Sequence, residues 1–218
     1  NMPLTLTVCI PCIQKHVYLL DRCINSINRQ ILHPNEIIIS ISSVIDLEKT
    51  ESTMKEIIDN YPRLLINVIY TKDAKFAGEN RNIAIKATNI KMSDIISFID
   101  ADDIMYPNRL YAIRRIFELY PKCLGMLHHF AENAEVRNEK WNFVDIAVKK
   151  YQYTQKLHFG HPSFRREVFN EFKYSSSPRM QDIKLIEKLL PKYISNLLIY
   201  EKKLTCYNSN DSTLYKTL

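Results

Sequence analysis

The chain has 218 residues, of which 46% are hydrophobic, and its formal net charge is +6 at pH 7. This length suffices for one domain with a sizeable core. No apolar run approaches the roughly 20 residues that a helix needs to cross a bilayer. The N-terminus also lacks the basic and apolar regions of a signal peptide, so we expect a cytoplasmic protein.

The positive charge favours an anionic partner, but Lys and Arg are dispersed along the chain, so we expect no nucleic-acid binding. The glycines are Gly78, Gly125 and Gly160. Neither GxGxxG nor GxxxxGK can be written with them, which excludes dinucleotide-binding and P-loop sites. The five cysteines are an odd number and several fall in predicted core segments, which favours reduced thiols.

The first seventy residues alternate between predicted strands and helices. Apolar runs with β-branched residues predict strands over 4–10, 36–41 and 64–70, the first of them ending at Pro11. Apolar residues at helical spacing predict helices over 17–30 and 47–58. This βαβαβ order implies right-handed crossovers and a parallel sheet, so the fold class is α/β.

Further along, the predicted elements become shorter. A polar loop over 71–80 contains Gly78, and the segments that follow it are a helix over 82–88, a strand over 95–99, a helix over 107–120, a strand over 124–130, helices over 164–172 and 181–190, and a strand over 197–200. The helix over 107–120 carries a predicted basic patch at Arg109, Arg114 and Arg115. No repeat or linker appears, so residues 2–218 are expected to form a single domain with helices flanking a mostly parallel sheet.

Three acids, Asp100, Asp102 and Asp103, directly follow the apolar run 95–99. In open α/β sheets, ligands bind at the carboxyl ends of the strands. Carboxylates this close repel one another, so either a nearby Arg or Lys or a divalent cation has to compensate them. The alternative is that they cap the next helix, which Pro107 would start.

Four segments, in this order, resemble the inverting glycosyltransferase family 2, whose members have the GT-A fold. They are 8–11 followed by 18–27, then 78–85, then 98–103 with Pro107, and finally 161–169 followed by Gln181-Asp182. The resemblance implies a Rossmann-like GT-A domain with a nucleotide-binding half at about 2–105 and an acceptor-binding half at about 106–218. It implies metal-dependent transfer, with inversion, from a nucleoside-diphosphate sugar, with UDP-sugars favoured, to a hydroxyl of a glycan or other acceptor.

The resemblance also assigns roles to residues. Asp102 would bind Mn²⁺ or Mg²⁺, Asp100 the ribose or the metal, and His161 the metal or a phosphate, while Asp182 would be the catalytic base. The residues expected to contact the donor are Pro11, Cys12, Ile13, Ser42, Asn80, Arg81, Asp100 and Ala101. Two roles are predicted for Asp103: it either supports the metal ligands from behind or caps the next helix. Trp141 is either a stacking platform for an acceptor sugar or a packing residue.

Two positions depart from the family pattern. Ile41 and Ser42 stand where the family has a pair of acids that hold the nucleotide base, and Gln181 replaces a glutamate. Two other functions therefore stay open, a nucleotidyltransferase-like enzyme and a non-catalytic module that binds nucleotide sugars. The domain is also compatible with a place in a larger polypeptide.

Overall fold

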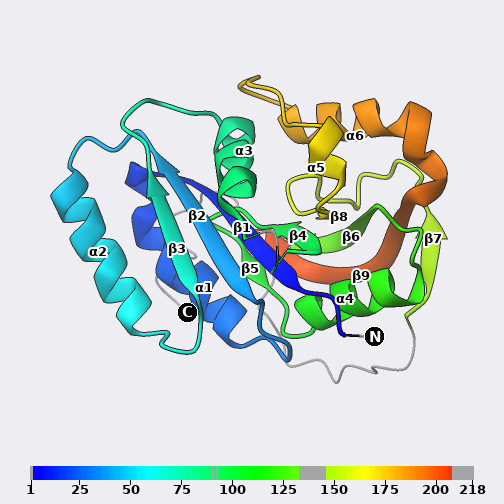
Figure 1. The fold of residues 1–218 in the computed structure, drawn as a ribbon, viewed down its shortest axis with the longest axis horizontal. Coiled ribbons are helices and arrows are strands. Elements are labelled where there is room, and N and C mark those ends of the chain that lie inside the picture. The colour runs from blue at the N-terminus through cyan, green and yellow to red at the C-terminus, as the bar shows by residue number, and fades with distance from the viewer. Residues whose placement is uncertain (1, 90, 92, 133–145, 208–218) are drawn as a thin grey trace.

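The computed structural model describes residues 2–89, 91, 93–132 and 146–207 (Figure 1). Within this part of the chain, nine strands form one sheet in the order β3-β2-β1-β4-β8-β6-β9-β5, with β7 beside β9. The strands are β1 (Leu6–Ile13), β2 (Glu36–Ser42), β3 (Ile66–Tyr70), β4 (Ile95–Phe98), β5 (Ile104–Met105), β6 (Gly125–Glu132), β7 (Val148–Lys150), β8 (Ser163–Arg165) and β9 (Leu197–Tyr207).

The sheet has a parallel half and a mixed half that meet at β4. Strands β3, β2, β1 and β4 are parallel, as the βαβαβ pattern predicts. Strand β8 then pairs antiparallel with β4 and with β6, and β6 runs parallel to β9 with two register shifts after His128. The carboxyl end of β4 therefore lies in the middle of the sheet.

Helices cover both faces of the sheet (Figure 1). Along β1, Val8 and Ile10 join the core under α1, α2 and α4, whereas Cys9 joins the core under α3 and α6. This alternation is the two-residue period of a strand buried on both faces. The helical segments are η1 (Gln14–Leu19), α1 (Leu20–Asn28), α2 (Leu47–Asp59), α3 (Ala77–Ala87), α4 (Arg109–Leu119), α5 (Val168–Glu171), α6 (Gln181–Tyr193) and η3 (Ile194–Asn196).

Strand β1 continues past Pro11, where the sequence predicted its end. The ladder between β1 and β4 stops at the pair Cys9 and Phe98, two residues before the proline. Pro11 would direct its missing N–H toward this side, so no ladder hydrogen bond is lost there. The strand thus reaches Ile13 and carries both Cys12 and Ile13 to the edge where the acids lie.

Two other element boundaries predicted from the sequence were wrong. Helix α3 begins at Ala77, so Gly78 lies in its first turn and not in a loop. A Cβ at Gly78 would come within 2.5 Å of the Ser175 carbonyl oxygen, so glycine is needed there for close packing. The predicted helix over 164–172 is mostly absent, because Phe164 pairs with both β4 and β6 as part of strand β8.

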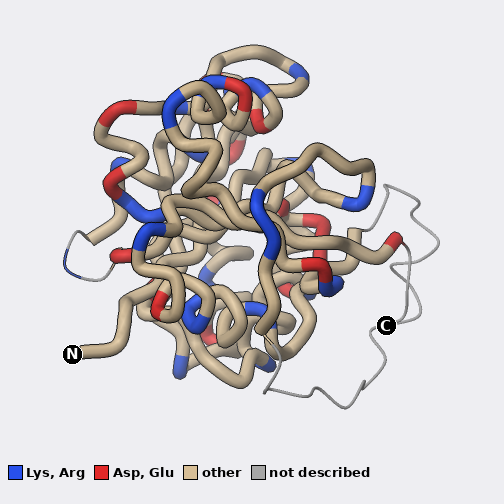
Figure 2. Tube along the Cα trace, turned by 90° about the vertical axis from the view of Figure 1, so that its right-hand side faces the viewer, with Lys and Arg blue, Asp and Glu red and all other residues tan. Residues whose placement is uncertain are grey.

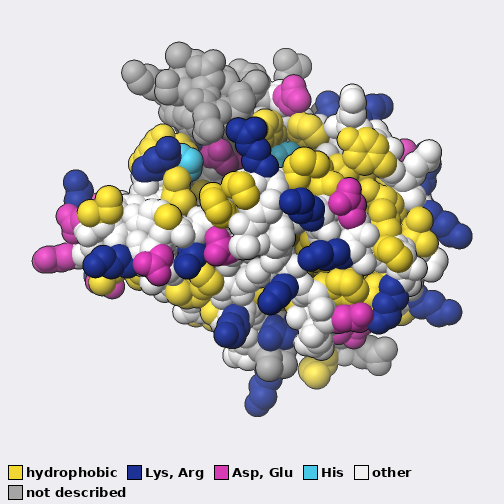
Figure 3. All heavy atoms as spheres, turned by 90° about the horizontal axis from the view of Figure 1, so that it is seen from above, with side chains coloured by type: hydrophobic (Ala, Val, Ile, Leu, Met, Phe, Trp, Pro, Cys, Tyr) yellow, Lys and Arg dark blue, Asp and Glu magenta, His cyan; other side chains and the backbone are white. Residues whose placement is uncertain are grey.

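Strand β9 is much longer than predicted and ends at Tyr207, so Cys206 belongs to the sheet. All five cysteines are buried and none forms a disulfide, as predicted. No helix in the described part of the chain is long and apolar enough to span a membrane. Lys and Arg are scattered along the trace among acidic residues (Figure 2) and spread over the face seen from above (Figure 3).

Gly125→Ala is expected to destabilise the fold by about 1–3 kcal/mol, as overpacking of a core does. A Cβ at this position would lie 2.6 Å from Cδ1 of Phe164, on the strand that joins the two halves of the sheet. Urea denaturation of the variant measures the change. Phe164→Val removes the δ and ε carbons that obstruct this position, so Gly125→Ala should cost less in that background; an equal cost in both would show that the ring is not the obstacle.

Candidate active site

A cavity of about 280 Å³ opens at the carboxyl ends of β1 and β4, beside the N-termini of α3 and α6. Its walls combine acidic, basic and apolar groups from segments that are far apart in sequence. The lining residues are Pro11, Cys12, Ile13, His16, Ala77, Asn80, Arg81, Asp100, Ala101, Asp102, Gln181, Asp182 and Tyr207. The cavity is therefore lined by all the residues predicted to bind the donor, to bind the metal or to act as the base, except Ser42 and His161.

Asp100 forms an ion pair with Arg81. The distance from Arg81 Nη2 to Asp100 Oδ1 is 2.6 Å, and the Arg81 side chain is almost fully buried. Burial lowers the pKa of Arg81, but Asp100, Tyr174 and Asp182 more than offset it, so the net shift is upward and the guanidinium stays charged. Within the described residues, Nε and Nη1 of Arg81 donate no hydrogen bond. Arg81 thus has donors left for an anionic ligand.

Asp102 is half-buried at the cavity wall, and Arg22 donates a hydrogen bond to its backbone carbonyl. Burial and the neighbouring charge of Asp100 raise the pKa of the Asp102 carboxyl to about 6. Burial is the larger of these two causes, and repulsion from Asp100 adds to it. A cation bound beside it would lower its pKa again, because an opposite charge favours the ionised form.

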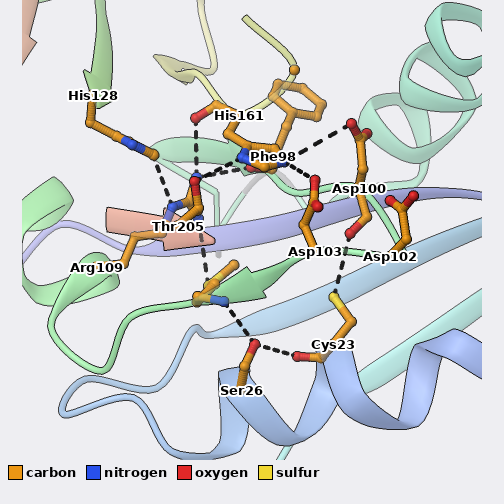
Figure 4. Close-up of polar contacts among 12 residues, drawn as sticks. Cys23, Ser26, Phe98, Asp100, Asp102, Asp103, Arg109, His128, His161 and Thr205 are labelled. Atoms are coloured by element: carbon orange, nitrogen blue, oxygen red, sulfur yellow. Dashed lines mark hydrogen bonds and ion pairs between the residues drawn. The ribbon is translucent and has the colours of Figure 1, made fainter. Parts of the chain in front are cut away.

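Asp103 points away from the cavity wall and is fully buried. Its Oδ2 lies 2.8 Å from Nε2 of His161, which in turn lies 3.9 Å from Asp100 Oδ2 (Figure 4). The capping alternative for Asp103 is wrong, since the residue that precedes helix α4 is Asn108. His161 does not line the cavity and stands behind Asp100 and Asp103.

Arg109 is completely buried, so the predicted basic patch does not include it. It donates hydrogen bonds to the carbonyl oxygens of Phe98 at 2.9 Å and His161 at 3.1 Å, and to Nε2 of His128 at 3.2 Å (Figure 4). Burial lowers its pKa to about 9. Arg109 thereby joins the end of β4 to the segment that carries His161.

Asn80 also lines the cavity, and its side-chain amide connects β1 to β2. Its Oδ1 accepts from Ser40 Oγ at 3.0 Å, and its Nδ2 donates to Cys12 O at 3.2 Å and to Ser42 Oγ at 2.9 Å. Ser42 is buried behind this amide and also donates weakly to the Lys75 carbonyl oxygen, at 3.4 Å. Both side chains, predicted to contact a donor, are engaged within the protein.

Asp182 lies in the first turn of α6 and borders the cavity, and its Oδ1 accepts a hydrogen bond from the Ile183 amide at 2.8 Å. The preceding Met180 has a left-handed backbone, with φ of 56°. This turn brings both Gln181 and Asp182 to the cavity wall. Gln181 Oε1 is buried and accepts no hydrogen bond within the described residues.

Sequence reasoning missed His158 and Tyr207. His158 stacks on His161 with ring centroids 3.7 Å apart, and Tyr207 lies 5.1 Å from His158 at the cavity wall. The close spacing of His158 and His161 in the sequence could have indicated that both belong to the site. Tyr207 was missed because the last strand was predicted over 197–200 only, whereas β9 reaches Tyr207. Trp141 lies outside the described residues.

A second, larger hollow of about 800 Å³ lies between η1 and α2 and shares only Ile13 with the cavity. Its one acid is Asp46, which accepts a hydrogen bond from the Lys49 amide and so caps α2. The smaller cavity is the better candidate for chemistry, because it holds the acids, Arg81 and Asp182 together.

A mostly parallel sheet with acidic residues following its central strand is consistent with the GT-A fold of glycosyltransferases. The chain belongs to glycosyl transferase family 2, whose family model matches residues 7–172. The resemblance and the fold predicted from the sequence are thus confirmed. No relative among curated proteins matches the sequence significantly.

Solved structures of two glycosyltransferases are similar in fold. S. aureus TarS 1-349 has a TM-score of 0.69 at 13% identity, over 94% of this chain and 60% of that one, and its complex with UDP-GlcNAc has a TM-score of 0.68 at 13% identity, over 99% and 61%. The mannosyltransferase PcManGT from Pyrobaculum calidifontis, in complex with GDP-Man and Mn²⁺, has a TM-score of 0.62 at 14% identity, over 91% and 57%. The chain spans about three fifths of each of these solved chains, and 38% of the longer solved chain of S. aureus TarS.

Asp102→Asn is expected to stabilise the metal-free protein above about pH 6. The pKa of Asp102 rises on folding from 3.8 to about 6, so the folded state binds this proton more tightly. The ionised carboxyl therefore costs folding free energy above pH 6, and the cost fades as the pH falls toward 3.8. Urea midpoints measured in EDTA should differ between wild type and variant by more near about pH 7.5, where the cost is complete, than near about pH 4.5, where only part of it remains.

The control for the change in net charge is Asp73→Asn, at an exposed loop acid. It should not reproduce the gain. A variant at position 102 that is no more stable than wild type near pH 7.5 would contradict the electrostatic cost assigned to this side chain.

Proposed function

We propose that the chain is the catalytic domain of a metal-dependent, inverting glycosyltransferase that moves a sugar from a UDP-sugar to a hydroxyl of a glycan or other acceptor. The observation that carries this is the single cavity shared by Asp100, Asp102, Arg81 and Asp182. Such a cavity combines groups for an anion, for a cation and for proton transfer. Membership of family 2 supports the same chemistry and speaks against a nucleotidyltransferase.

The diphosphate of the donor would lie against Arg81. Arg81 lines the cavity, two of its guanidinium nitrogens donate no hydrogen bond within the described residues, and a planar guanidinium fork matches phosphate oxygens well. Asp100 fixes the orientation of this side chain through the 2.6 Å contact. The low polarity around a buried cation strengthens its attraction for negative charge that grows on the leaving group.

Asp102, together with Asp100, would hold the divalent cation. Burial and the nearby charge of Asp100 raise the pKa of Asp102, so a cation beside this carboxylate would stabilise its ionised form, which fits a cation ligand. Oxygen ligands suit Mg²⁺ or Mn²⁺, ions that are often held by one or two carboxylates and by substrate phosphates. When bound, the ion would supply Lewis-acid stabilisation of the departing diphosphate. The Mn²⁺ complex of PcManGT supports this assignment.

Asp182 would act as the base that takes the proton from the acceptor hydroxyl. It lies on the cavity wall in the first turn of α6, where a negatively charged side chain interacts favourably with the helix dipole. Its Oδ1 is used by a backbone amide, which fixes the side chain and leaves Oδ2 for the acceptor. Asp182 shares this cavity with Arg81, so an acceptor hydroxyl bound beside its carboxylate would stand next to a donor whose diphosphate lies against Arg81.

For the nucleotide, UDP is favoured because TarS is solved with UDP and with UDP-GlcNAc. The wall formed by Pro11, Cys12 and Ile13 would contact the nucleoside. GDP is the second candidate, given the GDP-Man complex of PcManGT. A module that binds nucleotide sugars without catalysis is the alternative function, and donor hydrolysis by the wild type, measured below, separates the two.

Mn²⁺ with UDP is expected to raise the melting temperature of the wild type, because a ligand that binds only the folded state stabilises it. In Asp102→Asn, the Mn²⁺-dependent part of the UDP affinity should fall by about 100-fold, equivalent to the several kcal/mol that a Lewis acid supplies. Calorimetry with and without Mn²⁺ measures it, GDP serves as the comparison nucleotide, and Asp73→Asn is the charge control. Undiminished Mn²⁺-dependent binding would refute the role of Asp102.

Asp182→Asn is expected to lower kcat by about 10²–10⁴-fold, the usual contribution of general base catalysis. The Kd for UDP with Mn²⁺ should stay within about twofold, because the base acts only in the chemical step. Glu187→Gln, at an exposed acid of the same helix, is the matched control. Donor hydrolysis, followed with UDP-sugars, gives the rate; full activity in the Asp182 variant would exclude it as the base.

A further inference from the structure

Three contacts hold the guanidinium of Arg81 in place. Its Nη2 donates to Asp100 Oδ1 at 2.6 Å and, over a longer distance of 3.4 Å, to the carbonyl oxygen of Gly160. The third contact is with Tyr174, whose ring centroid lies 5.4 Å from Cζ of Arg81. Both side chains are almost fully buried. A cation that lies over an aromatic ring within about 6 Å of its centroid is attracted to it, and most strongly where water is excluded.

Tyr174 is itself fixed by the helix that carries Arg81. The side chain of Asn82, the next residue of α3, binds both backbone groups of Tyr174, since Nδ2 donates to the carbonyl oxygen at 2.9 Å and Oδ1 accepts from the amide at 3.0 Å. The ring packs edge-on against Phe98 and stacks on Phe169, with centroid distances of 5.4 Å and 6.2 Å. The protein alone therefore sets the position of this ring.

The hydroxyl of Tyr174 does not hold Arg81. It is buried and makes no hydrogen bond within the described residues. Burial raises the pKa of this phenol above its ordinary value, so the hydroxyl is neutral at pH 7 and forms no ion pair. The face of an aromatic ring carries the negative part of its quadrupole, which is the part that attracts a cation. Arg81 therefore interacts with the ring and not with the hydroxyl.

We propose that Tyr174, held in place by Asn82, is a positioning residue that sets the plane of the Arg81 guanidinium for binding of the donor diphosphate. This role rests on the proposed function, since it requires a diphosphate at Arg81. Asp100 and Gly160 bind the same nitrogen, so a further contact is needed to fix the plane, and the ring supplies it. A guanidinium with a fixed plane loses less conformational freedom when it binds a ligand, which raises the affinity.

The test compares the affinities of UDP and of uridine, because only UDP carries the diphosphate. In Tyr174→Leu, which removes the ring, the Kd for UDP with Mn²⁺ should rise by about tenfold, comparable with the loss of a desolvated cation–π contact. The Kd for uridine should stay within about twofold, whereas a general structural defect would weaken both ligands. Tyr174→Phe keeps the ring and removes only the hydroxyl, so its Kd for UDP should stay within about twofold. Calorimetry measures UDP binding, and ligand-observed NMR measures uridine binding.

Two further variants complete the experiment. Asn82→Asp keeps the ring but places a carboxylate oxygen against the Tyr174 carbonyl, so the Kd for UDP should rise by at least about threefold. It supplies the measurement if circular dichroism and a melting curve show that Tyr174→Leu does not fold. Phe172→Leu, at a half-buried aromatic residue that packs edge-on against Tyr193, is the matched control and should bind UDP like the wild type.

The positioning role is overturned if folded Tyr174→Leu or Asn82→Asp binds UDP like the wild type, or if the affinity for uridine falls in the same proportion. It is also overturned if Tyr174→Phe weakens UDP binding as much as Tyr174→Leu does, because the hydroxyl and not the ring would then be responsible. A wild type that binds neither UDP nor GDP with Mn²⁺ would instead overturn the proposed function itself, so the two failures are distinguishable.

Discussion

Repulsion among three carboxylates at the end of β4 is the constraint to which the rest of the site responds. Each of the three carboxylates has a different environment in the folded chain. Asp100 receives the buried guanidinium of Arg81, and Asp103 turns inward to His161. Asp102 remains at the cavity with its pKa raised to about 6. Burial and the charge of Asp100 together make the ionised form of Asp102 unfavourable, and this is the physical argument behind the proposal that a divalent cation binds there.

Two buried arginines make this arrangement rigid. Arg81 donates to the carbonyl oxygen of Gly160 at 3.4 Å, and Arg109 donates to those of Phe98 and His161. Together they connect α3, α4 and β4 to the turn that carries both histidines. Loss of one partner of a buried charge typically costs about 3–5 kcal/mol. Substitutions at these arginines would thus damage fold and site at once, whereas Asp102 and Asp182, which are only half-buried, can be changed with less harm to the fold.

The parallel half of the fold could be predicted because its information is local. Apolar strands, helical spacing and turn residues fix βαβαβ units, and chirality then places the acids after β4 beside the end of β1. The mixed half could not be predicted in this way. Phe164 has no strong local preference and becomes part of a strand only because β4 and β6 lie on either side of it. Gly78 was taken for a flexible residue, although it permits the close packing of α3 on the segment around Ser175.

The candidate site shows the same division. Asp100, Asp102, Arg81 and Asp182 were found because a family pattern names them, and all border one cavity. His158 lies in the turn after β7 and Tyr207 at the end of β9, and both come close to these residues in the folded chain. No sequence pattern specifies the course of that turn or the length of that strand. Ile41 and Ser42 stand where the family pattern has a pair of acids for the nucleotide base. Ile41 is apolar, and the Ser42 hydroxyl already accepts a hydrogen bond from Asn80. Apolar contacts discriminate by about 10–200-fold, against 10⁴-fold or more for a dedicated hydrogen-bonding site. On the proposed function, the selection of the donor therefore depends more on its diphosphate and sugar than on its base.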